Sequence, residues 1–351
     1  MHVVVPADVD DAAVPSGGNV YDRRVCRDLA RAGWAVRESP VAGAWPRPDR
    51  AARAALDRAL AGVPDGAVVL LDGLVACGVP DVVVPQAHRL RLVVLVHLPL
   101  GEEAGADLAA LERETLHAAR AVVATGPWTA RRLVARHGLA ARRVHVAPPG
   151  VDPAPPARGA DGATRLLCVG SLTPTKGQDL LVDALAAVAD PPLRCDLVGS
   201  LRRDTGYVAA VRGAIERRGL GGRVRVRGPW TGARLAAAYA GADLVVQPSR
   251  VEAYGMVVTE ALARGIPVLA AAAGGLPETL GRAPDGRVPG LLVPPDDVPA
   301  LAAALRRWST EPALRAELRG AARRRRDTLD GWEVTARCLA GVLRHASGTP
   351  G

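Results

Sequence analysis

The chain contains a single lysine, and its surroundings are suited to holding a phosphate. Of the 45 Lys and Arg residues, only Lys176 is a lysine. It lies in the segment GSLTPTKG, residues 170–177, between a strand-like apolar run and a helical stretch that begins near Gln178. Unpaired N–H groups at a helix N-terminus attract anions, and a compact ammonium reaches a phosphate where a guanidinium fork needs more room. We therefore predict that Lys176 contacts a phosphate. The alternative is a solvated lysine in an ordinary strand-to-helix loop.

A second group of polar residues lies in PSRVEAYGMVVTE, residues 248–260, where seven residues separate the carboxyl groups of Glu252 and Glu260. We expect Glu252 to lie in a loop and a helix to begin near Gly255. The backbone N–H groups of Gly255, Met256 and Val257 would then suit a diphosphate. Glu260, one turn further, could accept hydrogen bonds from both hydroxyls of a ribose. The alternative makes Glu252 a helix cap and Glu260 a surface residue.

The elements that must position these residues alternate along the chain. Val-rich runs without polar alternation predict parallel strands that are buried on both faces, and longer helical stretches separate them. We expect strands in the first half at Val3–Pro6, Val68–Leu71, Leu92–Val96 and Ala121–Ala124. In the second half we expect strands at Arg165–Val169, Arg194–Val198, Val224–Val226, Leu244–Gln247, Val268–Ala271 and Leu291–Val293. This alternation predicts an α/β protein.

The segment 147–164 is rich in Pro, Gly and Ala and is the clearest domain boundary. We predict an N-terminal Rossmann-like domain over 1–155 and a C-terminal one over 156–330, both doubly wound and facing across a cleft. Ligands of such sheets bind beyond the carboxyl ends of the strands. A last helix within 331–351 is expected to cross back to the first domain.

Composition restricts the class of protein. Hydrophobic residues make up 49% of the chain and charged residues 23%, as in a soluble globular protein. The five cysteines lack metal-ligand spacing, and Cys168 and Cys195, in apolar strand-like runs, are expected to be reduced and buried. No secretion signal and no membrane span is apparent, so we expect a cytoplasmic protein. The net charge of +9 permits an anionic ligand, and the stretch Arg47–Leu60 leaves a peripheral membrane association open.

These motifs resemble family-four glycosyltransferases, which are retaining, nucleotide-sugar-dependent enzymes of the GT-B fold. In that family a Lys-Gly pair contacts the diphosphate, and two glutamates with this spacing contact the sugar and the ribose. Lys176 with Gly177, Glu252 and Glu260 match these positions. The segment EALARGIPV (260–268), the segment GGLPE (274–278) and the element GLLVPP (290–295) match as well.

The first half matches the family more loosely. The segment SGGN, residues 16–19, resembles the glycine loop whose backbone approaches the sugar and its phosphates, which implicates Gly17 and Gly18 in donor binding. His97 ends a Val-rich strand where the family often has a histidine near the sugar. One departure is Ser171, which stands where many relatives have an arginine. Ser171 offers the donor a hydroxyl, and whether Arg250 or Arg202 supplies the missing charge stays open.

The resemblance implies a hexosyltransferase that moves a sugar from a nucleotide-diphosphate sugar to a small-molecule, glycan or lipid acceptor. His97, Lys176 and Glu252 would be the catalytic residues, with no cofactor and no metal ion. One alternative is a catalytically silent nucleotide-sugar-binding protein on the same scaffold. Another is a nucleic-acid binder, suggested by the pI of about 10.1 but disfavoured by an aromatic content of 3%. Acceptor, nucleotide base and oligomeric state stay open.

Overall fold

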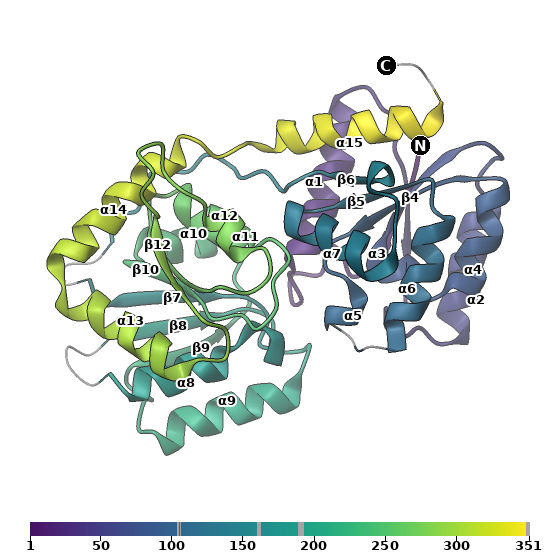
Figure 1. The fold of residues 1–351 in the computed structure, drawn as a ribbon. Helices are drawn as coiled ribbons and strands as arrows, with labels where there is room; N and C mark the ends of the chain where they lie inside the picture. The colour runs from purple at the N-terminus through teal and green to yellow at the C-terminus, as the bar shows by residue number, and fades with distance from the viewer. Residues whose placement is uncertain (104, 106, 160–162, 189–192, 349–351) are drawn as a thin grey trace. The chain divides into compact units, whose positions relative to one another are not determined.

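The computed structural model describes residues 1–103, 105, 107–159, 163–188 and 193–348, which form two compact units (Figure 1). The first unit contains Met1–Asp10, Gly17–Gly150 and the chain from Gly331 on. The second contains Asp11–Ser16 and Val151–Asp330. Among the described residues, no helix has both the length and the apolar character needed to cross a bilayer.

The first unit is built on a six-stranded parallel sheet in the order β2-β1-β3-β4-β5-β6. Most central strand positions are buried because helices cover both faces, which explains the Val-rich runs. The strands are β1 His2–Pro6, β2 Arg37–Val41, β3 Val68–Asp72, β4 Arg91–Val96, β5 Ala121–Ala124 and β6 Val144–Val146.

The helices of the first unit include the last helix of the chain, α15 (Trp332–Ser347), which packs against α1 (Gly17–Arg31) and against β3, β4 and β5. The rings of Tyr21 and Trp332 meet edge to face at 5.8 Å. The other helices are α2 Arg50–Ala61, α3 Gly73–Ala76, α4 Pro80–Val83, α5 Leu100–Glu103, α6 Asp107–Ala118 and α7 Pro127–His137, with short 3₁₀ turns at Val84–His88 and Ala141–Arg143. The N- and C-terminal parts of the chain thus share one core.

The second unit has a six-stranded parallel sheet in the order β12-β11-β10-β7-β8-β9. Its strands are β7 Arg165–Val169, β8 Arg194–Val198, β9 Val224–Gly228, β10 Leu244–Gln247, β11 Val268–Ala271 and β12 Gly290–Val293. Its helices are α8 Gln178–Ala186, α9 Thr205–Arg217, α10 Gly232–Ala240, α11 Met256–Leu262, α12 Leu276–Leu280, α13 Val298–Thr310 and α14 Pro312–Arg326, with a 3₁₀ turn at Pro174–Lys176.

Two hydrophobic clusters fill the second unit, one on each face of its sheet. The larger lies under α8, α9 and α13 and includes the fully buried Trp308. The other lies under α10, α11 and α12. Leu, Val and Ala supply most of both clusters, as expected of a chain without Phe.

The predicted α/β class with two doubly wound sheets is confirmed. All ten predicted strands are present, with shifts of at most two residues at their ends. Two strands were missed, β2 and β6. The sequence of β2, RESPV, is polar because β2 is an edge strand that is mostly exposed, and β6 is three residues long at the opposite edge.

Candidate functional site

The predicted site residues fall into two groups, one in each unit, and the group in the second unit lies at the point where strand order reverses. In the second unit this point is between β7 and β10, which are neighbours in the sheet. The loop with Lys176 follows β7, and the loop with Glu252 follows β10. The carboxyl ends of strands at such a switch point form the usual ligand-binding crevice of an open α/β sheet.

Lys176 and Glu252, which are 76 residues apart in the sequence, form an ion pair. The Lys176 ammonium donates to Glu252 Oε2 over 2.7 Å, and the two side chains retain 29% and 14% of their accessibility. Gln247 Nε2 also donates to this oxygen (3.3 Å). A cation and an anion are therefore presented together, and both remain reachable by a ligand.

Glycines make this pairing possible because the two loops approach each other closely. Gly177 has φ +68°, and a Cβ there would lie 2.2 Å from the Pro248 carbonyl oxygen. Gly274 has φ +55°, and its Cβ would lie 1.9 Å from the Glu252 carbonyl oxygen. That same oxygen accepts a hydrogen bond from the Gly275 N–H (2.9 Å). Gly274 and Gly275 thus fix the backbone of Glu252 in a way that larger residues could not.

Arg250 fixes the position of the loop that contains Lys176 through several hydrogen bonds. Its guanidinium donates to the Pro174 carbonyl (2.7 Å), makes two bonds to Asp179 (2.9 and 2.8 Å) and one to Asp296 (2.6 Å). Hydrogen bonding to Asp179 is the main reason why the pKa of Arg250 is raised. Its charge is neutralised by these carboxylates, so Arg250 is poorly suited to replace the arginine that is absent at Ser171. The Ser171 carbonyl accepts from Gln178 Nε2 (3.1 Å).

Glu260 lies in the first turns of α11 and is partly buried, unlike a solvated surface glutamate. The Tyr239 hydroxyl donates to Glu260 Oε2 (2.6 Å), and Arg264 stacks over the Tyr239 ring at 4.6 Å. Burial raises the pKa of Glu260, while the Tyr239 hydrogen bond and the Arg264 charge oppose that rise. Gly255 (φ +86°) precedes α11, whose first residues are Met256 and Val257.

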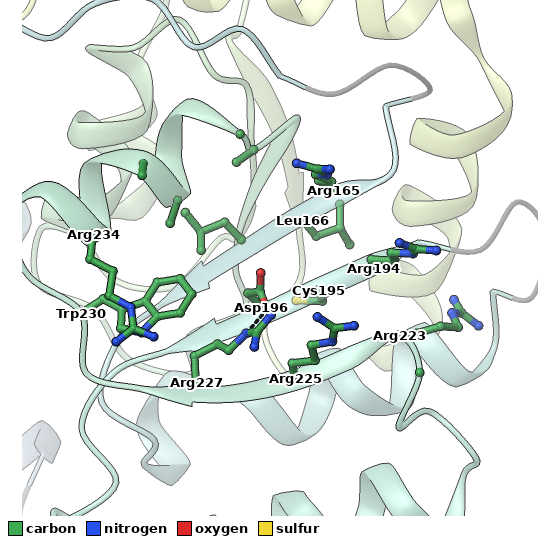
Figure 2. A pocket seen from close by; sticks show the side chains of 16 residues that line it. Arg165, Leu166, Arg194, Cys195, Asp196, Arg223, Arg225, Arg227, Trp230 and Arg234 are labelled. Carbon is green, nitrogen blue, oxygen red and sulfur yellow. Dashed lines mark hydrogen bonds and ion pairs between the residues drawn. The ribbon is translucent and has the colours of Figure 1, made fainter.

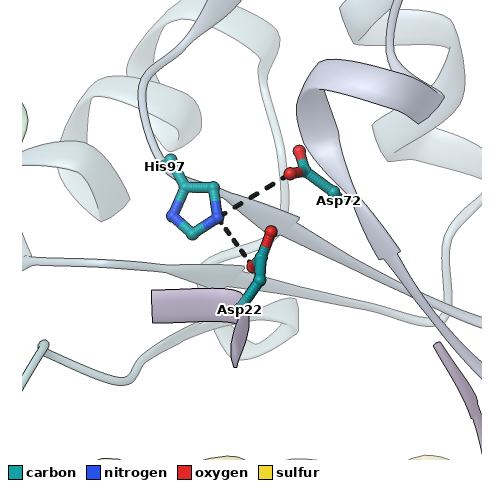
Figure 3. Close-up of side chains that lie close together, drawn as sticks. All are labelled: Asp22, Asp72 and His97. Carbon is teal, nitrogen blue, oxygen red and sulfur yellow. Dashed lines mark hydrogen bonds and ion pairs between the residues drawn. The ribbon is translucent and has the colours of Figure 1, made fainter. Parts of the chain in front are cut away.

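In the first unit, His97 follows β4 and lies beside the beginning of α1, which starts at Gly17 (Figure 3). A Cβ at Gly18 would lie 3.2 Å from His97 Cδ2, so the absent side chain makes room for the imidazole ring. Tyr21 contacts the same ring edge to face at 5.2 Å. These contacts fix the plane of the His97 ring.

Two buried aspartates face the Nε2 atom of His97. Asp22 Oδ1 lies 3.0 Å and Asp72 Oδ2 3.9 Å from this nitrogen, and the two carboxyl side chains are only 3% and 4% exposed. Asp72 also accepts from the Leu74 N–H (2.6 Å). Burial, and next the charge of Asp22, raise the pKa of Asp72 well above its ordinary value, although His97 opposes the rise. The raised pKa favours the protonated form of Asp72 over a wider pH range than that of a free aspartate.

A proton held between the two carboxyl groups would explain why they lie together in the interior. Asp22 Oδ2 is buried and has no hydrogen-bond partner among the described residues. A protonated Asp72 supplies a donor for Asp22, which relieves the repulsion between two buried charges. The donor atoms of Asp22, Asp72 and His97 lie within 4.8 Å of one another. Within the part of the chain that the structure describes, these three residues could therefore together hold a metal ion.

Sequence reasoning missed Asp22, Asp72, Tyr239 and Arg264. Asp72 left a signal, because it is the acidic end of a fully buried strand, VVLLD. Asp22 lies one helical turn after Gly18 and hence on the same face of α1. Tyr239 and Arg264 gave no signal, since their proximity to Glu260 depends on how α10 packs beside α11.

Two family models match the chain. The model described as Glycosyltransferase Family 4 matches residues 15–155, and the model described as Glycosyl transferases group 1 matches residues 156–325. D-inositol 3-phosphate glycosyltransferase 1 of Catenulispora acidiphila is 36% identical over 292 residues, covering 77% of this chain and 67% of the relative. The enzyme of the same name from Kineococcus radiotolerans is 35% identical, covering 67% of this chain and 59% of its own length.

The matched regions span between 54% and 67% of the lengths of the similar curated relatives. Among solved structures, sucrose-phosphate synthase from Thermosynechococcus elongatus superposes with a TM-score of 0.81 at 23% identity, covering 99% of both chains. The Anabaena protein HepE, solved in complex with UDP-glucose, gives a TM-score of 0.78 at 20% identity and covers 98% of this chain and 100% of its own. These likenesses show a GT-B fold.

Proposed function

The chain belongs to glycosyltransferase family 4, and on that premise we propose that it transfers a hexose from a nucleoside-diphosphate sugar to an acceptor with retention of anomeric configuration. In this reaction the bond between the sugar C1 and the diphosphate oxygen breaks, and a bond between C1 and the acceptor oxygen forms. The acceptor's proton passes to the departing diphosphate. No metal ion or other cofactor takes part in the proposed reaction.

The observation that carries this proposal is the Lys176–Glu252 ion pair at the switch point of the second unit. Without a ligand the two charges neutralise each other. A bound diphosphate would take the Lys176 ammonium as a charge-assisted partner, and Glu252 would be released to accept hydrogen bonds from sugar hydroxyls. Lys176 would then stabilise the negative charge that develops on the leaving diphosphate, the kind of interaction that commonly contributes 10²–10³ in rate.

We assign ribose binding to Glu260. Tyr239 engages Oε2 of this carboxylate, and a ribose hydroxyl could hydrogen-bond the other oxygen. Because Tyr239 is buried and Arg264 stacks on it, the carboxylate has few orientations open to it. Fixing the group in advance lowers the entropy lost when a ligand binds.

For His97 we propose a hydrogen bond to the transferred sugar. Nε2 of His97 faces Asp22, which orients the ring (Figure 3). Gly18 keeps a bulky side chain away from this ring. We place the protein in the cytoplasm, where nucleotide sugars are available.

Calorimetry with UDP, GDP, ADP and their glucose conjugates tests the proposal, beginning with UDP-glucose because HepE was solved with it. Lys176→Ala should weaken binding of the preferred nucleotide about ten- to hundredfold, the loss expected for one charged hydrogen bond. Arg212→Ala, which removes an exposed cation on α9, is the control and should bind like the wild type. If none of the nucleotides binds, the donor proposal is wrong.

An assay of sugar transfer distinguishes a transferase from a catalytically silent binding protein. We would offer D-inositol 3-phosphate first as acceptor, because several relatives bear that name. Glu252→Gln should retain nucleotide binding and lose sugar transfer. Nucleotide-sugar binding without transfer to any acceptor, and without hydrolysis, would favour the silent protein.

A further inference from the structure

One region of the second sheet carries an unusual concentration of arginines away from the residues assigned to the donor. Helices α8 and α9 cover one face of β8 and β9, where Cys195, Leu197 and Val224 are buried. On the opposite face the same strands present charged side chains to a hollow of about 460 Å³ beside α10. Figure 2 shows the arginines that line it: Arg165, Arg194, Arg223, Arg225, Arg227 and Arg234.

The charges in this hollow are unbalanced. Asp196 is the one acidic side chain among the lining residues, and it pairs with Arg227 over 2.6 Å. Arg223 directs its guanidinium to the backbone carbonyls of Val188 (2.7 Å) and Leu193 (3.0 Å). The four that remain have no acidic partner among the described residues: Arg165, Arg194, Arg225 and Arg234.

These cations come from three adjacent strands and one helix. Arg165 of β7 lies opposite Arg194 of β8, and Asp196 of β8 lies opposite Arg225 of β9. Neighbouring strands are separated by about 4.8 Å, so the cations extend over roughly 10 Å across the sheet. That width exceeds a single phosphate group and suits an anion with several charged groups in a row.

The shape of the hollow and its other side chains restrict the kind of anion. A membrane-binding surface usually combines its cations with exposed apolar side chains, but the large hydrophobic residues that are exposed in the described chain, Val20 and Leu292, do not line this hollow. Trp230 does not offer a free ring for a nucleotide base, because Arg234 stacks on it at 4.5 Å and Arg227 lies 5.8 Å away. A compact, soluble anion fits better.

We propose that this hollow binds a compact anion that carries two or more linked phosphate groups, at a site separate from Lys176. Guanidinium groups bind phosphate oxygens through paired, directed hydrogen bonds, and an anion there would offset their mutual repulsion. The site shares no residue with the donor-binding group and does not depend on the proposed transfer reaction.

Calorimetry with inorganic tripolyphosphate, pyrophosphate and monophosphate tests this site. Lys176→Ala serves as the parent protein, because it lacks the cation assigned to the donor diphosphate. We expect tripolyphosphate to bind this parent more tightly than pyrophosphate, and monophosphate to bind at least tenfold more weakly than tripolyphosphate. Binding should weaken as salt is raised.

Matched variants locate the binding. Adding Arg194→Ala and Arg225→Ala to the parent should weaken tripolyphosphate binding at least tenfold. Adding Arg212→Ala and Arg217→Ala removes the same charge from exposed positions on α9 and should change the affinity less than twofold. The four substituted side chains are exposed, so the variants should fold, as circular dichroism would verify.

Three results would overturn the proposal: no binding of tripolyphosphate by the wild type, equal losses in the two pairs of variants, or loss of all binding in Lys176→Ala alone. The last would assign the anion to the donor site. A failure of nucleotide binding in the earlier experiment would leave this site unaffected.

Discussion

The buried proton assigned to Asp72 makes a quantitative prediction about the substitution Asp72→Asn. An asparagine reproduces a protonated aspartate: its amide can donate to Asp22 as the carboxyl proton does, and its carbonyl can accept from the Leu74 N–H. The variant should therefore fold like the wild type while having no group to titrate at this position.

The direction of this pH dependence follows from the number of protons that the folded and the unfolded states bind. The folded-state pKa of Asp72 is raised above the ordinary value of 3.8, so between these two pKa values the folded protein holds a proton that the unfolded chain has lost. The contribution of Asp72 to stability is therefore complete below pH 3.8 and decreases as pH rises toward the raised pKa. One proton corresponds to about 1.4 kcal/mol per pH unit.

From pH 5 to pH 7 the stability of Asp72→Asn relative to the wild type should therefore rise by up to about 2.7 kcal/mol. For a unit of this size that difference is roughly 5–10 °C in melting temperature. Thermal unfolding of both proteins at pH 5, 6 and 7, with and without EDTA, measures it. Asp28→Asn on α1 is the control: the neighbouring Arg27 lowers the pKa of Asp28, so its carboxyl is ionised throughout this range and its difference from the wild type should stay constant.

Parallel pH curves for the wild type and Asp72→Asn would refute the reasoning, because they would mean that Asp72 is ionised in the folded protein. A wild-type melting temperature that falls on adding EDTA, with no such fall in Asp72→Asn, would mean that a cation and not a proton lies between the aspartates.

Three further predictions concern the second unit. Gly274→Ala should lower stability by at least about 1–2 kcal/mol and weaken donor binding, because its Cβ would lie 1.9 Å from the Glu252 carbonyl; Gly219→Ala has a similar φ of +64° with open space around it, and equal effects in the two variants would contradict this explanation. Tyr239→Phe should cost about 1 kcal/mol in stability and weaken nucleotide binding with little change in kcat; an unchanged Kd would remove Glu260 from the ribose site. Lys176→Arg keeps the charge and should still lower kcat at least tenfold, so a wild-type rate would show that the lone lysine is a matter of chance.

The sequence predicted the strands that are buried on both faces, because their Val-rich runs need no knowledge of neighbours. It also predicted the positions of Lys176 and Glu252 at the ends of such strands. It could not reveal that Arg250 is neutralised by Asp179 and Asp296, because both carboxylates are distant in the sequence. The partnership of Asp22, Asp72 and His97 was hidden for the same reason: it arises only when α1, β3 and β4 assemble.

The packing of α15 against α1 has a consequence for the order of events during synthesis. The second unit is nearly continuous in the chain, so most of it can fold as soon as its residues leave the ribosome. The first unit lacks the partner of α1 until residues 332–347 have been made, after the other described elements of that unit. At about 5–20 residues per second, the α1 surface around Tyr21 then stays uncovered for many seconds, an interval in which chaperones would have their main opportunity to bind the nascent chain.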